Sequence, residues 1–495
     1  MIKNIKWLFL VSLTIVACSD DETVVVNNTS DGLPLTAGSA DFSNYVSLGN
    51  SLTAGYCDNA LFIEGQANSY PAILADQFAL VGGGEFKIPY TNDNTGGLLL
   101  GGNVIAGPRL YFNGAGPAPV TGIPTTEVST VLAGPFNNMG VPGAKSFHLL
   151  APGYGNVAGV ATGQANPYFV RFASSPSTTI LADAAAQDPT FFSLWIGNND
   201  VLGYATSGGS GTNQTGNFNP ATYGPNDITD PNVFANVYTA LVDGMTANGA
   251  QGVVANLPYV TTIPFFTTVP HNPVPLNAAT AAQLNAGFSA YNNGLLFAQS
   301  VGLLTADEVT RRTISFTAST TNRVVMVDSY LTNLAAYGIP SYRQATSEDL
   351  VVLPARSFIG TVVGGNPAQI NGVSVPLADN WILSKDEILE VKTATDAYNA
   401  TIQSIASAKG LAFVDANALM TQVANGGITA NNFTVTSNYV TGGGFSLDGV
   451  HPSPRGYALI SNEFIKAINA TYGSNFKGVS LGSYRILYPQ NPDNF

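Results

Sequence analysis

The chain has 495 residues, 45% of them hydrophobic, so it is long enough to bury a large core and could hold two domains. Its formal net charge is −13 and it contains no cluster of Lys and Arg, which argues against nucleic acid as a partner. Only 10% of the residues are charged, so the surface must rely on Asn, Thr, Ser, Gly and Tyr.

The first residues have the pattern of an export signal. Lys3 and Lys6 precede an apolar run, Trp7 to Val16, that is too short to span a bilayer as a mature helix. The run ends in Ile15 to Cys18, which resembles the lipobox of bacterial lipoproteins. The resemblance implies a signal peptide at 1–17 and diacylation of Cys18; the alternative is an ordinary signal peptide with a chance cysteine.

An acidic stretch, Ser19 to Glu22, follows at once. It resembles the surface-export signal of lipoproteins in Bacteroidetes-type bacteria, and it equally fits the start of a solvated, flexible tether at 18–40. Two acyl chains would anchor the protein stably in a membrane. We therefore expect a lipoprotein of the cell envelope, in the outer membrane, on either its periplasmic or its cell-surface side.

Tyr45 to Leu48 predict the end of a buried strand, followed by a glycine turn and a helix that begins at Ser51. Free backbone N–H groups and the helix dipole favour developing negative charge at such a position, which suits a nucleophile. The position equally suits a plain N-cap. Cys57, the only cysteine after Cys18, is expected on the same helix as a small buried packing residue, so no intrachain disulfide is expected.

Residues 82–134 are rich in Gly, Pro and Asn and predict long loops or short strands. A short strand near 136–140 then leads to a turn that contains Gly143, and to a helix at 146–150. Without a side chain, Gly143 could bring a backbone N–H close to a ligand, although it could equally be an ordinary turn glycine. His148 lies in this helix and is expected to pack.

A largely apolar run, Pro189 to Ile196, predicts a strand buried on both faces of a parallel sheet. It ends in Gly197 to Asp200, and polar residues at the carboxyl end of such a strand are where open α/β sheets bind ligands. A helix at 233–247 and a strand at 252–258 follow. This alternation predicts a doubly wound α/β domain.

The pattern loosens from 259 to 379, with a helix expected over Ala279 to Ser300, and predicts an insertion that forms a cap or wall over one end of the sheet. His271 lies there in a Pro-rich loop and is expected to be exposed. Ser384 and Glu387 have the spacing of a capping box that opens a helix to about Lys409. A buried strand at 411–415 and a glycine-rich loop follow.

Asp448 stands three residues before His451, ahead of a helix at 455–470 and a surface segment at 471–495. A histidine can act as general base and then acid near pH 7 when an acid holds its other ring nitrogen in the correct tautomer. By itself, the spacing also fits a surface loop with no role.

Four stretches in this order resemble the SGNH, or GDSL-type, serine hydrolases: Gly49-Asn50-Ser51-Leu52, Gly143, Gly197-Asn198-Asn199-Asp200 and Asp448-Gly449-Val450-His451. The resemblance implies a three-layer α/β/α fold with a central, mostly parallel sheet. One hydrolase domain would span 41–470, with insertions at about 82–134 and 259–379. It implies neither a cofactor nor a metal.

The resemblance also implies roles by position. Ser51 would attack an ester carbonyl, with His451 as base and Asp448 orienting the imidazole. The backbone N–H groups of Ser51 and Gly143 and the side-chain amide of Asn199 would hold the oxyanion, each such donor being worth about a hundred- to a thousand-fold in rate. Asp200 would be structural.

One residue departs from the family pattern: Asn50 stands where the family name carries an aspartate. The asparagine lacks the charge of an aspartate but keeps a hydrogen-bonding oxygen.

From the four matching stretches we expect a serine ester hydrolase acting on lipid or acylated carbohydrate esters. The alternative is a non-catalytic surface lipoprotein that binds glycans or lipids on an esterase scaffold. A metalloenzyme is disfavoured because three scattered histidines and one free cysteine do not make a closed site.

Overall fold

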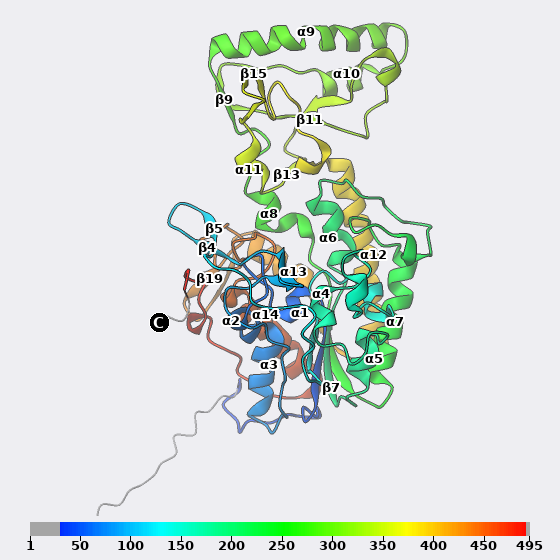
Figure 1. Cartoon of the computed structure of the whole chain (residues 1–495), viewed down its shortest axis with the longest axis vertical. Coiled ribbons are helices and arrows are strands. Elements are labelled where there is room, and N and C mark those ends of the chain that lie inside the picture. The colour runs from blue at the N-terminus through cyan, green and yellow to red at the C-terminus, as the bar shows by residue number, and fades with distance from the viewer. Residues whose placement is uncertain (1–29, 492–495) are drawn as a thin grey trace, which may run out of the picture.

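The computed structural model describes residues 30–491 and is built around a parallel sheet of five strands (Figure 1). The strands lie in the order β17-β8-β7-β1-β6, and every pair is parallel. Their bounds are β1 (Tyr45–Gly49), β6 (Asn138–Gly140), β7 (Phe191–Trp195), β8 (Gln251–Ala255) and β17 (Ala412–Val414). The strands of the middle, β1 and β7, are buried along their whole length, as their continuous apolar runs predict.

Helices cover both faces of the sheet. On one side α3 (Tyr70–Ala79) packs against α14 (Pro454–Tyr472), and on the other α7 (Pro231–Thr246) packs between α5 (Ile180–Ala185) and α12 (Lys385–Lys409). The three-layer α/β/α architecture predicted from the sequence is therefore confirmed. Helices α1 (Ser51–Ala54), α6 (Asn199–Thr206) and α13 (Ala416–Ala424) follow the carboxyl ends of β1, β7 and β17.

Local sequence signals set the ends of α12. Ser384 Oγ accepts from the N–H of Glu387 at 3.4 Å, and the Glu387 carboxylate accepts from the N–H of Ser384 at 2.7 Å, which completes the predicted capping box. Gly410 ends the helix in the left-handed conformation, with φ of 64°.

The segment at 82–134, predicted as long loops or short strands, contains two short hairpins. Strand β2 (Leu98–Leu100) pairs with β3 (Asn103–Ala106), and β4 (Leu110–Phe112) pairs with β5 (Pro117–Pro119). Other small elements of the body include α2 (Ile63–Ala67), α4 (Pro167–Val170), the 3₁₀ turn at Ser146–Leu150, β18 (Ile428–Ala430) and β19 (Phe433–Val435).

The second insertion stands out from the body as a lobe beyond the carboxyl end of the sheet (Figure 1). Its outer part is α9 (Ala278–Ser300), as predicted, and α10 (Ala306–Arg312), which share a small apolar cluster of their own. Short strands fill it: β9 (Val274–Leu276), β10 (Ser319–Asn322), β11 (Val325–Val327), β12 (Tyr342–Gln344), β14 (Val362–Val363) and β15 (Asn366–Ile370).

The root of the lobe joins the body through α8 (Pro264–Thr267), β13 (Leu350–Val351), α11 (Ala355–Phe358) and β16 (Ile382–Leu383). At this root the N–H of Phe265 donates to the carbonyl of Gly449 at 2.9 Å, and the N–H of Leu353 donates to the carbonyl of Phe265 at 2.7 Å. The lobe is therefore bonded to the loop that carries His451, while its outer helices lie far from it.

Three local expectations need correction. Cys57 is buried, as expected, but it follows helix α1, which Gly55 ends with φ of 81°. Residues 30–40, expected within a flexible tether, bind the body: the N–H of Ser30 donates to Asn475 O at 2.7 Å. The expected surface segment near the C-terminus buries Phe476 and Tyr488 in the core.

The expected signal peptide at 1–17, the expected lipidation site Cys18 and the acidic stretch Ser19 to Glu22 lie outside the described residues. Within 30–491, no helix is long and apolar enough to cross a membrane.

Candidate active site

The end of β1 places Ser51 at the first position of α1. Position 49 has room only for glycine, because a Cβ there would lie 2.1 Å from Thr53 Oγ1 and 2.5 Å from the carbonyl oxygen of Trp195. The N-cap of α1 is Asn50, whose Oδ1 accepts from the N–H of Leu52 at 3.0 Å. Of the two interpretations of this stretch, the N-cap role therefore belongs to Asn50, and Ser51 is available for chemistry.

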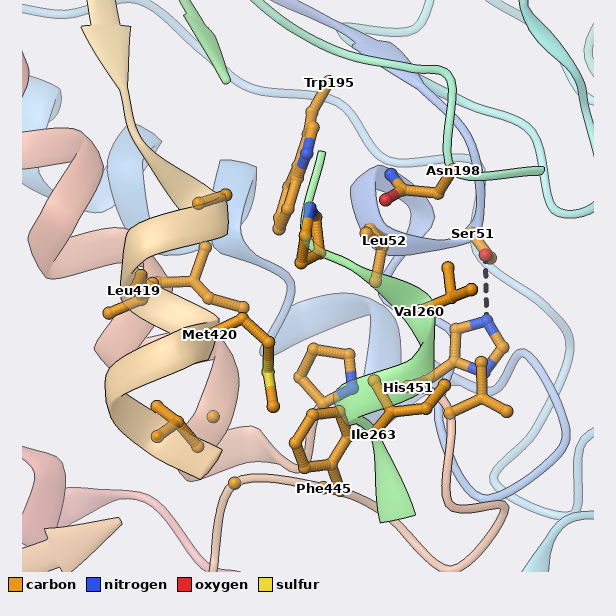
Figure 2. Close-up of a pocket in the computed structure, with 18 of the residues that line it drawn as sticks. Ser51, Leu52, Trp195, Asn198, Val260, Ile263, Leu419, Met420, Phe445 and His451 are labelled. Carbon is orange, nitrogen blue, oxygen red and sulfur yellow. Dashed lines mark hydrogen bonds between the residues drawn. The ribbon is translucent and has the colours of Figure 1, made fainter. Parts of the chain in front are cut away.

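Ser51, His451 and Asp448 form a continuous hydrogen-bonded chain (Figure 2). Ser51 Oγ lies 2.9 Å from His451 Nε2, and His451 Nδ1 lies 2.8 Å from Asp448 Oδ2. A carboxylate can only accept, so Nδ1 carries the proton in neutral His451 and Nε2 presents its lone pair to the serine hydroxyl. This is the geometry of a nucleophile with its base and an acid that fixes the tautomer.

The Asp448 carboxylate is held by backbone and side-chain donors. Its Oδ1 accepts from the N–H groups of Val450 and His451, each at 2.8 Å, and from Ser446 Oγ at 3.0 Å. Its Oδ2 also accepts from the N–H of Asn59 at 3.1 Å. Burial alone would raise the pKa of Asp448, but the imidazole and these hydrogen bonds outweigh it and lower the pKa below the ordinary value. The group is therefore kept ionised.

A second buried acid, Asp58, supports the same loop and was not found from the sequence. Its Oδ1 accepts from the N–H of Leu447 at 2.8 Å, and its own N–H donates to Ser446 Oγ at 3.0 Å. Burial raises the pKa of Asp58 to about 7. Asp58 and Asn59 both have positive φ, which these residue types tolerate, so the dipeptide itself was the available sign of a tight turn.

The predicted oxyanion donors lie at the ends of the two strands beside β1. Gly143, with φ of 80°, follows β6, and Asn199 opens α6 after β7. Asn199 Nδ2 donates to the carbonyl of Ala144 at 2.9 Å, and since an amide nitrogen has two hydrogens, one remains for a ligand. Within residues 30–491, the N–H groups of Ser51 and Gly143 donate to no acceptor.

Asp200 has the structural role that was predicted. It is fully buried and accepts from the N–H and the hydroxyl of Ser146, at 2.8 and 2.7 Å. These bonds hold the turn after Gly143 against the start of α6.

The other two histidines do not join the site. His148 Nδ1 accepts from the N–H of Lys145 at 3.0 Å, its ring stacks on Tyr154, and burial lowers its pKa to about 4, so it packs as predicted. His271 is half-buried at the base of the lobe, where its carbonyl accepts from the N–H of Val324, and it is less exposed than expected.

A groove opens beside Ser51 and His451, with about 830 Å³ of empty space including its mouth. Its polar residues are Asn50, Ser51, Asn198, Asn199 and His451. The rest of the wall is almost wholly apolar: Leu52, Trp195, Leu202, Pro258, Val260, Ile263, Ala416, Leu419, Met420, Val423, Val435, Phe445, Val450, Pro452, Leu459 and Ile460, with Gly444 and Gly456. Figure 2 shows the Ser51–His451 pair at one end and Leu419, Met420 and Phe445 toward the other.

Four residues of this wall, Ala416, Leu419, Met420 and Val423, come from α13, a stretch predicted as part of a loop. Asp415 caps it, and the apolar residues Ala416, Met420 and Val423 recur at helical spacing, so the signal was present but short. The large insertion contributes only Val260 and Ile263, from its first residues.

The described residues contain no cluster of three or more His, Cys, Asp or Glu side chains that could hold a metal ion. Fold and site together define an α/β/α protein with a Ser-His-Asp arrangement at the carboxyl ends of its parallel strands.

No family model and no curated protein matches the chain. Two solved structures align with it at low similarity. A mutant of Axe2, an acetyl-xylooligosaccharide esterase from Geobacillus Stearmophilus, is 10% identical with a TM-score of 0.31, over 87% of this chain and 96% of the other. An extracellular lipase from Streptomyces rimosus is 13% identical with a TM-score of 0.28, over 87% and 99%. Likeness at this level assigns no function.

Proposed function

We propose that this protein is a serine ester hydrolase that works through an acyl-enzyme. The observation that carries the proposal is the chain from Ser51 Oγ through His451 to Asp448, with separations of 2.9 and 2.8 Å at the mouth of an apolar groove. A hydroxyl, a base and an orienting acid at these distances are the parts that acyl transfer needs.

In the first half-reaction Ser51 Oγ attacks the ester carbonyl while His451 Nε2 takes the hydroxyl proton. The electron pair of the carbonyl moves onto its oxygen, which the N–H groups of Ser51 and Gly143 and the free hydrogen of Asn199 Nδ2 can bind. The tetrahedral adduct then collapses, and the C–O bond to the alcohol breaks. The imidazolium returns its proton to the departing alkoxide, which leaves an acyl group on Ser51.

In the second half-reaction water replaces the alcohol. His451 Nε2 removes a proton from the water as its oxygen attacks the acyl carbon, and the resulting adduct expels Ser51 Oγ, which recovers the proton. Asp448 stays ionised throughout, because its hydrogen bonds stabilise the charged form. No cofactor enters either step.

The groove favours an ester with a long aliphatic acyl chain over an acetylated carbohydrate. Its wall beyond Ser51 is apolar, and each CH₂ of an aliphatic chain that is buried there contributes about 0.8 kcal/mol of favourable binding free energy. A sugar would leave its hydroxyls without partners there. The lipobox-like stretch at Ile15 to Cys18 supports action at the cell envelope, with the N-terminal lipid in the outer membrane.

The test is turnover of p-nitrophenyl butyrate by the wild type, Ser51→Ala and Ser177→Ala, an exposed serine as the matched control. We expect Ser51→Ala to reduce turnover at least a thousand-fold with little change in thermal unfolding, and Ser177→Ala to match the wild type. Unaltered activity in Ser51→Ala would refute the proposal.

A non-catalytic binding protein on the same scaffold is the rival. A fluorophosphonate probe separates the two, because it reacts only with an activated serine. Labelling of the wild type at Ser51, lost in Ser51→Ala, supports the hydrolase; a folded protein that the probe leaves unlabelled supports the binding protein. Comparison of acetyl with decanoyl p-nitrophenyl esters then tests the preference for a long acyl chain.

A further inference from the structure

One residue that the proposed mechanism does not use, Tyr56, is connected to all three members of the chain from Ser51 to Asp448. Its N–H donates to the carbonyl of Ser51 at 3.0 Å. Its ring lies against the imidazole of His451, with ring centroids 4.7 Å apart and planes tilted by 50°. Its hydroxyl donates to the carbonyl of Asn59 at 2.7 Å, and the N–H of Asn59 donates in turn to Asp448 Oδ2.

The main chain fixes where this ring stands. Gly55 ends α1 with φ of 81°, and a Cβ there would lie 2.6 Å from the carbonyl oxygen of Gly65, so the turn into Tyr56 requires glycine. The carbonyl of Tyr56 accepts from the hydroxyl of Tyr457, a buried residue of α14, at 2.8 Å. Both polar groups of the Tyr56 main chain are therefore bonded, one within α1 and the other to α14.

The side chain of Tyr56 is held as well. It is half-buried, and the ring of Tyr168 from α4 packs edge-on against it, with centroids 6.4 Å apart and planes at 85°. Burial, and after it the neighbouring Tyr168 and Asp448, raise the pKa of the Tyr56 hydroxyl, so it stays protonated and donates to Asn59. The ring that faces the imidazole is thus anchored at its base, its edge and its tip.

The hydrogen bonds of His451 do not by themselves fix the plane of its ring. They hold Nδ1 at 2.8 Å from Asp448 and Nε2 at 2.9 Å from Ser51, but a hydrogen bond weakens steeply only when its angle falls below about 120°. Proton transfer is more demanding, since a misplacement of about 1 Å can cost about a hundredfold in rate. A ring packed against the imidazole limits the tilt that the hydrogen bonds allow.

We infer that Tyr56 is a positioning residue of this site: its ring holds the His451 imidazole so that Nε2 faces first Ser51 Oγ and then the departing alkoxide. Tyr56 acts through His451 and exchanges no proton itself. Its hydroxyl has a separate task, which is to hold the turn at Asn59 that bonds Asp448. The inference rests on the proposed ester hydrolysis and adds a residue to its machinery.

The experiment compares two butyrate esters whose alcohols differ in their need for a proton. His451 must take a proton from Ser51 with both esters, but only the ethoxide of ethyl butyrate also needs that proton returned, because p-nitrophenolate is a stable leaving group. A tilted imidazole therefore lowers kcat/KM more for ethyl butyrate than for p-nitrophenyl butyrate. A smaller folded fraction lowers kcat/KM for both esters equally.

Tyr56→Leu removes the ring, and we expect it to lower kcat/KM about tenfold for p-nitrophenyl butyrate and about a hundredfold for ethyl butyrate. Tyr56→Phe keeps the ring and loses only one hydrogen bond, so it should stay within about threefold of the wild type with both esters. If Tyr56→Leu does not fold, Tyr56→Met, whose flexible side chain fills the space without a rigid ring, gives the same comparison.

The matched control is Tyr291→Leu in the outer lobe. Tyr291 is also half-buried, its hydroxyl donates to the carbonyl of Tyr342 at 2.5 Å, and the two rings lie 5.9 Å apart. This variant loses comparable contacts far from His451. It should keep the wild-type kcat/KM with both esters, whatever its change in thermal unfolding.

The outcomes separate this inference from the proposed function. An equal loss for the two esters in Tyr56→Leu, or a loss in Tyr56→Phe as large as in Tyr56→Leu, overturns the role of the ring and leaves ester hydrolysis standing. Hydrolysis of neither ester by the folded wild type overturns both proposals.

Discussion

The backbone N–H of Asn59 donates to Oδ2 of Asp448 at 3.1 Å, the same oxygen that accepts from His451 Nδ1. The turn that follows the nucleophile helix is thereby bonded directly to the acid of the same site. Since Asp58 in this turn also holds the N–H of Leu447, the two halves of the site are aligned by contacts within the protein before any substrate arrives.

Asp448→Asn should lower kcat by about 10⁴-fold while KM changes little. An amide that keeps its oxygen on the N–H groups of Val450 and His451 must turn Nδ2 toward the imidazole, which forces Nδ1 to accept. Nε2 then carries the hydrogen and cannot take the proton of Ser51. Steady-state kinetics with a p-nitrophenyl ester checks this, with thermal unfolding as the control; a fall in kcat under tenfold contradicts it.

Asp58→Asn should make the protein more stable at pH 8 and leave it almost unchanged at pH 4. The folded pKa of Asp58 is raised to about 7 from 3.8, so the wild type has this residue's full contribution to stability below pH 4 and loses it as pH rises to 7. The gain at pH 8 is at most about 4 kcal/mol, at about 1.4 kcal/mol per pKa unit. Denaturant unfolding at both pH values measures it.

Glu85→Gln is the control for that series, since Glu85 is exposed and forms only a loose surface pair with Lys87 at 3.5 Å. Because an exposed ion pair contributes at most about 1 kcal/mol, this variant should change the stability little at either pH value. A pH-independent effect of Asp58→Asn would show that its burial does not disfavour the charged form.

Gly449→Ala should reduce activity and stability together. Gly449 has φ of 71°, and an added Cβ would lie 2.9 Å from Leu353 Cδ2 and 3.2 Å from the N–H nitrogen of Phe265, so either these neighbours or the loop that carries His451 must shift. Gly410→Ala is the matched control: it has φ of 64° and open space around the new Cβ. We expect both variants to lose about 1 kcal/mol or more of stability, and only Gly449→Ala to lose at least tenfold in kcat.

Leu419→Trp should shorten the acyl chains that the enzyme accepts. Leu419 lies half-buried in the groove wall on α13, and the larger ring would fill the far end of the groove. We expect kcat/KM for decanoate to fall at least tenfold and that for acetate to stay within about twofold. Leu389→Trp, an exposed residue on α12, should change neither. An equal fall for both esters would place the acyl chain elsewhere.

The layers of the fold could be predicted because their signals are local. Strands β1, β7, β8 and β17 are short, mostly buried apolar runs, and the Ser384 capping box needs only residues three positions apart. The places of Ser51 and Asn199 after buried strands could be predicted in the same way, since residues that end neighbouring parallel strands meet at one edge of the sheet. The roles of Ser51, Asn199 and His451 came instead from the resemblance to the SGNH hydrolases.

What the sequence did not reveal depends on contacts between distant segments. The contacts of Asp58 with Leu447 and of Asn59 with Asp448 each join residues 389 positions apart, and no local pattern encodes them. The same holds for the groove, whose wall combines α13, α14 and the start of the lobe. The lobe itself was predicted as an insertion, but its projection away from the sheet depends on how its root packs.

The distance along the chain between nucleophile and base affects when the protein can act. Ser51 and His451 are 400 residues apart, so a chain emerging from the ribosome carries its nucleophile long before it carries the base. At about 5–20 residues per second, that interval lasts about 20 to 80 seconds. The proposed hydrolysis therefore cannot begin until the C-terminal part of the chain, with His451, has folded onto the part that carries Ser51.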